Sequence, residues 1–371
     1  MNIYLFDIGL AALTFIVLSW HFAIFYMVIQ YRKHGSVSKV RTLIHASFGL
    51  YILCAYFLII MPLPDPAALE PFQGITHYMN LIPLRFIHDF ILGTSLSLVN
   101  IHTFIPALRE PVFFQPAFNI LLTIPFGIYL SYYFRQNFKK TVLFTFLLSL
   151  FFELTQLTAL YGIYPSPYRL FDVDDLLLNT LGGALGFFIY KHILFFLPSR
   201  EKIDADSLKR SDKVGYIRRF IAFFIDHKIA LLLSTVILGF FNVDGMAHLI
   251  LSGFILYFYF IVSLLIFKQT PGKSLVRIKL QQENENWSYS ASVLCRYAIL
   301  ILTISIYNIL VWLVANTYAN AIYALLQLCL MTAVFLDLLI SLKRSKVLFY
   351  EKMSKMRNVS TKIERPISDI L

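Results

Sequence analysis

Acidic and amide side chains gather in one stretch of this 371-residue chain, from Thr141 to Gly186. Glu153 stands inside an apolar run, where a charged side chain costs at least ~2.5–3.5 kcal/mol on insertion scales and so usually has a partner or a function. Gln156 follows it by three residues, and a helix turns both side chains the same way. The pattern predicts a membrane site that works by charge pairing and hydrogen bonding.

Three predicted helices and one loop can bring further polar groups to Glu153. The helices cover Gln115–Phe134, Thr141–Tyr161 and Asp175–Leu197, and the loop Gly162–Asp174 joins the last two. We expect them to surround a polar cavity, roofed by the segment that begins at Asn80. The candidate ligand-binding residues are Asn80, Arg85, Asn119, Glu153, Gln156, Arg169, Asp172, Asp174, Asp175 and Asn179.

Structural roles remain open for the same residues. Asp174 or Asp175 can cap the helix that begins there and favour its positive dipole end. A lone buried carboxyl at Glu153 must be protonated or paired, and Arg169 and Arg85 are the nearest cations by topology. The acids do not form a ligand-count pattern, so we predict no metal site.

The composition excludes a soluble globular protein, since 58% of the residues are hydrophobic and only 14% are charged. The net charge of +11 comes largely from loops next to apolar runs, which is typical of membrane proteins and does not indicate a nucleic-acid partner. The three cysteines all lie in apolar runs, without a ligand spacing. We therefore predict a lipid-bilayer environment and no cofactor.

The fold class predicted is all-α, a polytopic membrane protein with about nine spanning helices in two bundle modules. Loops rich in Lys and Arg follow every odd-numbered helix, and this alternation predicts a multi-pass protein of the cell membrane with its N-terminus outside and its C-terminus cytoplasmic. The predicted spans are Phe6–Gln30, Leu43–Met61, Gln115–Phe134, Thr141–Tyr161, Asp175–Leu197, Ile217–Phe241, Met246–Phe267, Val293–Ala315 and Asn320–Leu342.

The charged stretch 198–216 is the predicted cytoplasmic linker between two transmembrane domains, residues 1–197 and 217–360, with a cytoplasmic tail at 361–371. The outer segment Pro62–Phe114 is broken by prolines and predicts a re-entrant or interfacial helix. The alternation in SLVRIKL, residues 274–280, predicts a short strand or hairpin at the membrane surface.

The first half resembles the VanZ family of Gram-positive membrane proteins. The resemblance rests on NLIP at Asn80–Pro83, on PFG at Pro125–Gly127 and on R-x2-D-V-D-D-x3-N-T-x-G-G from Arg169 to Gly183. Phe118 departs from the family, which more often has glycine there. The resemblance implies work at the cell envelope, because the founding member raises resistance to teicoplanin without belonging to the enzymes that rebuild the peptidoglycan stem peptide.

The second half places charges near the cytoplasmic ends of its helices. Arg219 and Asp226 are two turns apart, about 10 Å, which is too far for a relaxed direct pair. We expect Arg296 to pair with Asp226, and Asp337 to complement Arg218 or Arg219. A charge network that only fixes helix packing is the plainer interpretation.

This half resembles the RDD family, named for an arginine and two aspartates. Arg219, Asp226, the turn Thr270–Lys273 and Arg296 match its pattern. Glu351 stands where the family usually has the aspartate of a His-Asp pair. A glutamate keeps the negative charge but has a longer side chain than an aspartate. The resemblance implies a poorly defined function for which transport is often proposed.

The favoured function is a non-enzymatic envelope protein whose first half binds an amphiphile at the outer leaflet. The amphiphile would be a lipid-linked cell-wall precursor or a lipoglycopeptide-type antibiotic. Its binding would lower the sensitivity of the cell to teicoplanin-like antibiotics. A secondary transporter of a small ligand or ion is the first alternative. A membrane enzyme acting on a lipid-linked substrate, with Glu153 or Asp175 as base, is the second, although the sequence lacks the usual nucleophile–base motifs.

Overall fold

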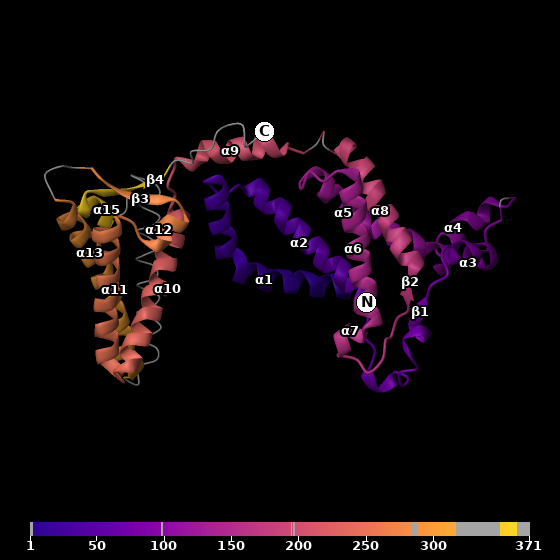
Figure 1. The fold of residues 1–371 in the computed structure, drawn as a ribbon, viewed down its shortest axis with the longest axis horizontal. Helices are drawn as coiled ribbons and strands as arrows, with labels where there is room; N and C mark the ends of the chain where they lie inside the picture. Colours follow the sequence, from indigo (N-terminus) through magenta and orange to yellow (C-terminus); the bar gives the residue numbers. More distant parts are fainter. Residues whose placement is uncertain are drawn as a thin grey trace. The chain divides into compact units, whose positions relative to one another are not determined.

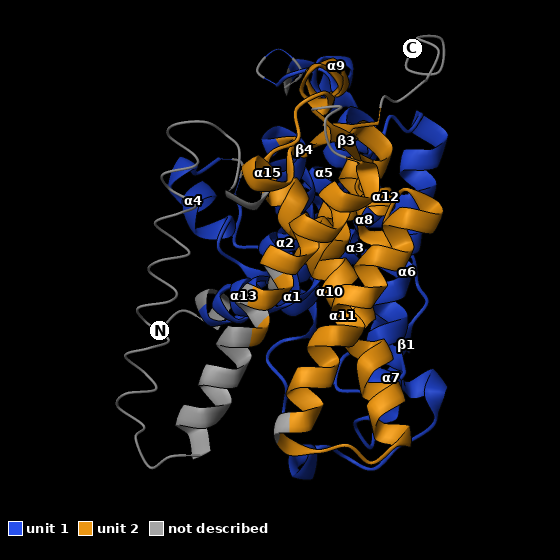
Figure 2. Cartoon of the chain, turned by 90° about the vertical axis from the view of Figure 1, so that its left-hand side faces the viewer, with its two compact units in different colours: residues 1–22, 39–203 blue, residues 23–38, 204–371 orange. Residues whose placement is uncertain are grey.

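The computed structural model describes residues 3–97, 99–193, 195, 197–283, 288–316 and 349–361. The described chain is mostly helical and forms two compact units (Figures 1 and 2). Unit 1 comprises Met1–Phe22 and Lys39–Ile203, and unit 2 comprises Ala23–Ser38 and Asp204–Leu371. The ninth predicted span, with Asp337, lies outside the described residues.

The apolar composition of the helices makes the chain a multi-pass membrane protein. Five described helices are long and apolar enough to cross a membrane. These are α2 (Lys39–Ile60), α5 (Pro111–Tyr132), α6 (Phe138–Leu157), α10 (Tyr216–Phe240) and α11 (Gly245–Phe267). The two halves of α1 (Ile3–His34), bent by 59°, make a sixth if they count as one span. The total of about nine spans stays a prediction.

Close packing of α5, α6 and α8 (Val173–Ile193) forms the centre of unit 1. A Cβ at Gly182 would overlap the carbonyl of Ile120 on α5, and one at Gly183 would overlap Thr145 on α6. Small residues therefore let these helix backbones approach closely. Pro125 lies inside α5, and α5 continues through it as one helix.

The proline-rich segment before α5 consists of short elements. The two-residue strand β1 (Met79–Asn80) pairs in parallel with β2 (Phe171–Asp172), just before α8. Next come α3 (Arg85–Gly93) and α4 (Phe104–Ala107), which Figure 1 shows beside the N-terminal end of α8. The remaining elements are the 3-10 helices η1 (Pro66–Ala68), η2 (Ile75–Tyr78) and η3 (Ile101–Thr103).

Two predicted boundaries differ from the structure. Helix α6 ends at Leu157 and not at Tyr161, because the short α7 (Ala159–Gly162) contains left-handed backbone at Ala159, Leu160 and Tyr161. The predicted linker 198–216 contains a helix, α9 (Arg200–Ser211), on which Ile203 and Ser207 are buried. Its polar composition favoured a linker without such structure, and burial of a few small or apolar side chains overrides that tendency.

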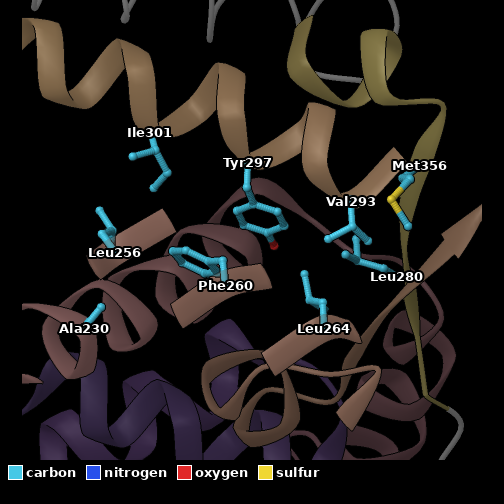
Figure 3. Close-up of a cluster of buried hydrophobic side chains, with 9 residues drawn as sticks. All are labelled: Ala230, Leu256, Phe260, Leu264, Leu280, Val293, Tyr297, Ile301 and Met356. Atoms are coloured by element: carbon cyan, nitrogen blue, oxygen red, sulfur yellow. The ribbon is translucent and has the colours of Figure 1, made fainter. Parts of the chain in front are cut away.

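Helices α10, α11 and α13 (Tyr289–Asn316) form the core of unit 2. Figure 3 shows Phe260 and Tyr297 facing each other in this core, with ring centroids 4.5 Å apart. Strand β3 (Ile278–Gln282) confirms a strand at the end of SLVRIKL, whose first two residues lie in a short helix, and it pairs antiparallel with β4 (Met356–Ser360). The sequence had not indicated β4. The remaining short helices are α12 (Pro271–Leu275) and α15 (Phe349–Ser354).

The second half of α1 belongs to unit 2 rather than to the predicted first domain. Tyr31 packs in a buried cluster with Ile221, Ala222 and Val276. The guanidinium of Arg218 lies over the Tyr31 ring, 5.2 Å from its centroid. The N-terminal helix therefore supplies part of the second unit's core.

Candidate functional site

The polar residues of unit 1 meet where β2 leads into α8. The pairing of β1 with β2 sets Asn80 opposite Asp172, and the Asn80 amide donates to Asp172 Oδ2 over 2.9 Å. The other oxygen, Oδ1, accepts the backbone N–H of Asp174 over 2.8 Å. Asp172 therefore caps the first turn of α8, a role that the sequence left between Asp174 and Asp175.

Asp174 instead caps a different helix. Its Oδ1 accepts the N–H of Leu84 over 2.6 Å, and its Oδ2 accepts the N–H of Phe86 over 2.9 Å. Leu84 has left-handed backbone, with φ 64°, and α3 begins at the next residue. Because these hydrogen bonds go to an ionised acceptor, they are stronger than neutral ones. The buried carboxylate thus fixes the start of α3 on the polar cluster.

Glu153 and Asp175 face the same region from neighbouring helices. Glu153 Oε2 accepts the N–H of Asp172 over 2.9 Å, and Asp175 Oδ1 accepts the amide of Asn119 over 2.5 Å. The two carboxylates interact electrostatically. This part of the structure brings together residues that the sequence nominated from α5, α6 and the start of α8. We call Asn80, Asn119, Glu153, Asp172, Asp174, Asp175 and Asn179 the acidic cluster.

A second polar layer lies one helical turn deeper. The buried Asn179 donates from Nδ2 to Ser149 over 2.9 Å, and the Asn179 carbonyl accepts the hydroxyl of Thr123 over 2.6 Å. Gln156, which is also buried, donates to the carbonyl of Ile59 over 3.1 Å and so ties α6 to the end of α2. Ser149 and Thr123 were missed because isolated hydroxyls in apolar helices give no sequence signal beyond helix packing.

The two arginines of the predicted site behave differently. Arg169 donates to the carbonyl of Met61 over 2.6 Å, and its charge acts on both Glu153 and Asp175. Arg85 was wrongly placed in the site: its side chain is 53% exposed and lies 3.6 Å from Asp89. Arg85 is the first residue of α3, and Asp89, four residues later on the same helix, pairs with its charge.

Unit 2 contains a charge network centred on the buried Glu351. Glu351 Oε2 pairs with Arg219 over 2.5 Å, and Oε1 pairs with Arg296 over 3.1 Å. Asn358 on β4 also donates to Oε1. The two-turn spacing predicted that Arg219 and Asp226 do not pair directly, and the structure agrees. Glu351 therefore occupies the acidic position that the resemblance implied only weakly.

The predicted pair of Asp226 with Arg296 is wrong. Asp226 accepts hydrogen bonds from the hydroxyls of Tyr259 (3.0 Å) and Thr270 (2.5 Å) and from the N–H of Gly272 (2.7 Å). The turn before α12 folds back onto α10, so the carboxylate binds this turn. Arg296 pairs with Glu351 instead.

Two further cations complete this picture. Lys273, on the same turn, is buried against Tyr297, and Asp226 acts on it electrostatically. Burial lowers the pKa of Lys273 to about 7, and the charge of Arg296 adds to the effect. Arg218 donates to the carbonyls of Val276, Ser211 and Arg277 over 2.7–2.9 Å. The sequence missed Lys273 as a network member because only the fold of the turn buries it.

Family comparisons agree with this division of the chain. Residues 48–197 match the model of the VanZ/LLP1 family, and residues 213–346 match the model of the RDD family. The first match includes the acidic cluster, whereas Glu351 lies just beyond the second. Neither a curated protein nor a solved structure matches the chain. The chain is therefore a fusion, in N- to C-terminal order, of a VanZ-like region and an RDD-family region.

Proposed function

We propose that unit 1 binds an amphiphile at the outer leaflet of the cell membrane and thereby lowers sensitivity to teicoplanin-like antibiotics. One observation carries the proposal: Asp174 joins the acidic cluster directly to α3. A polar site and an apolar surface are thus fixed side by side, which is what an amphiphile requires of a binding site.

The apolar surface runs along α3 and the residues that follow it. Ile91 is 68% exposed and Leu92 is 73% exposed, while the Phe90 ring lies tilted against that of Phe113 on α5, 6.2 Å between ring centroids. Exposed apolar groups of this kind favour a membrane interface over water. The alternation of basic loops along the sequence favours the outer leaflet for this end of unit 1.

The outer-leaflet role is tested in a strain that lacks the gene and carries either wild type or a variant, with protein amounts matched by blotting. Wild type should restore tolerance to a panel of lipoglycopeptide antibiotics. Glu153→Gln and the double change Ile91→Ser, Leu92→Ser should each restore less. Glu283→Gln, an exposed change in unit 2, is the matched control. Unchanged susceptibility after deletion of the gene would falsify the proposal.

We propose binding and not catalysis for this site. Both oxygens of Asp172 and both of Asp174 accept hydrogen bonds that hold the local fold, which favours a scaffold for a ligand. Chemical change in undecaprenyl-type lipids after incubation with the purified protein would contradict this part of the proposal.

Transport is the second candidate, and unit 2 favours it. Lys273 is buried beside Asp226 and Tyr297, and its pKa of about 7 lets it exchange a proton near neutral pH. Proteoliposomes that contain the protein should then show proton or cation flux, and Lys273→Met should abolish it. Wild-type protein without flux would exclude this candidate.

A further inference from the structure

The carboxylates of the acidic cluster differ in how many of their oxygens are engaged. Asp172 and Asp174 use all four oxygens on hydrogen bonds from Asn80 and from backbone N–H groups. These two acids therefore stabilise the local fold and have no oxygen left without a hydrogen bond for a ligand.

Glu153 and Asp175 each use one oxygen. Within the described part of the chain, Glu153 Oε1 and Asp175 Oδ2 have no hydrogen-bond partner. Their charges act on each other across the α6–α8 contact. Two such carboxylates close together repel unless a positive charge or a proton lies between them.

Asn179 adds an independent observation just below these acids. It is only 3% exposed, and its Oδ1 has no hydrogen-bond partner among the described residues. Asn179 lies one turn after Asp175 on α8 and bonds to Ser149, which lies one turn before Glu153 on α6. A buried acceptor without a donor costs free energy, so a water or a ligand donor at this atom would stabilise the site.

Three unengaged acceptors therefore lie within about two turns of one another on the packed helices α6 and α8. Arg169 is the cation that acts on both acids, and it already donates to the carbonyl of Met61. A protonated amine has three donors and no acceptor, and it carries the missing positive charge. A metal ion fits less well, since the described residues include no group of three or more His, Cys, Asp or Glu arranged to hold one.

We propose that the amphiphile bound by unit 1 carries a protonated primary amine, which binds Glu153 and Asp175 with Asn179 Oδ1 beneath. This inference rests on the proposed function and narrows it. A lipid-linked precursor that joins lipid to sugar through pyrophosphate would bring negative charge toward four carboxylates. The cluster favours an amine-bearing amphiphile over such a head group.

The test measures competition for the site on the full-length protein in lipid nanodiscs, with empty nanodiscs subtracted. A fluorescent alkylamine is bound first and then displaced by dodecylamine, by its neutral N-acetyl derivative or by dodecyl phosphate. These probes share the chain and differ in the head group. Dodecylamine should displace the reporter about tenfold better than the other two, as expected for one well-placed charge pair.

Variants locate the effect. Glu153→Gln and Asp175→Asn should each remove the preference for the amine, whereas Asp89→Asn, on the exposed side of α3, should keep it. Thermal unfolding and size-exclusion profiles establish that each variant is folded. If one variant is not folded, the other and the wild-type series still decide the outcome.

Each outcome has a distinct meaning. Equal displacement by amine and N-acetyl derivative, or stronger displacement by the phosphate, overturns the amine inference and leaves amphiphile binding standing. No saturable binding of any alkyl probe, with the reporter included, overturns both the inference and the proposed function. Retained preference in both cluster variants places the amine elsewhere and overturns the assignment.

Discussion

Two buried glutamates show how differently the two units treat charge. Glu351 in unit 2 has an arginine on each oxygen, so its negative charge is neutralised by side chains of the protein. Glu153 in unit 1 accepts a backbone N–H on one oxygen and leaves the other without a partner in the described structure. Both side chains are almost fully buried.

The difference indicates different uses. A charge that is paired within the protein contributes to a fixed structure and has little left for a ligand. A carboxylate whose only hydrogen bond comes from a backbone N–H keeps one oxygen for a ligand. We therefore interpret the Glu351 network as a packing device and the acidic cluster as a binding site, and the following substitutions test that contrast.

The largest effect is expected for Glu351→Gln. The change removes the counter-charge that the buried Arg296 shares with the partly buried Arg219, which should cost about 3–5 kcal/mol of unfolding free energy. Chemical unfolding of the purified protein in detergent measures it.

The matched control for this change is Glu283→Gln. Glu283 pairs with Arg357 over 2.7 Å, but these side chains are 45% and 55% exposed. Water screens such a pair, so the loss should stay within about 1 kcal/mol. Equal losses for the two variants would show that the Glu351 network does not hold unit 2 together.

Gly182→Ala should have the next largest effect, since α8 packs closely against α5 at this residue. The added Cβ would overlap the carbonyl oxygen of Ile120, so the backbone of α5 or α8 must move. This movement should lower the free energy of unfolding by about 1–3 kcal/mol. Gly9→Ala, where no atom lies within 4 Å of the added carbon, is the control. A similar unfolding free energy for both variants would contradict the packing geometry.

Asp174→Ala should act locally. Loss of the cap should reduce the stability of α3 by about 1–2 kcal/mol, as other helix-cap deletions do. Faster hydrogen–deuterium exchange at residues 84–93 measures it. Asp65→Ala removes a comparable cap on η1 and should leave α3 unchanged. Unaltered exchange in α3 would mean that its connection to the acidic cluster is not energetically significant.

Glu153→Gln should have the smallest effect on stability, within about 1 kcal/mol, even though Glu153 is as buried as Glu351. A glutamine can still accept the N–H of Asp172, and no buried guanidinium loses its partner. The same unfolding experiment compares the two glutamine variants. A loss near that of Glu351→Gln would remove the contrast between the units.

Hydrophobic patterns predicted much of the fold. Runs of about 20 apolar residues placed α2, α5, α10 and α11 within a few residues of their ends, because such a run has few other stable structures in a membrane. Boundaries failed where backbone conformation decided them, as at Leu160. Strand β4 was missed because its pairing with β3 joins segments far apart in sequence.

The acidic cluster was also largely predictable, and its internal connections were not. Helical spacing and antiparallel topology bring Asn119, Glu153 and Asp175 to one level of the bundle. The hydrogen bonds of Asp174 depend on the left-handed residue Leu84, which no local pattern indicates. The partners of Asp226 could not be predicted without knowing how the turn at Thr270 folds. Charge alone wrongly indicated Arg296 as the partner.

The place of Tyr31 in the core of unit 2 bears on how such a fusion arises in evolution. Joining two genes at α9 alone would give a second module without residues 23–38, and the cluster around Ile221 and Val276 would lose one side. A second module encoded without these residues would need another segment to cover that cluster. Splitting the gene at α9 would therefore separate the two family regions without giving two intact cores.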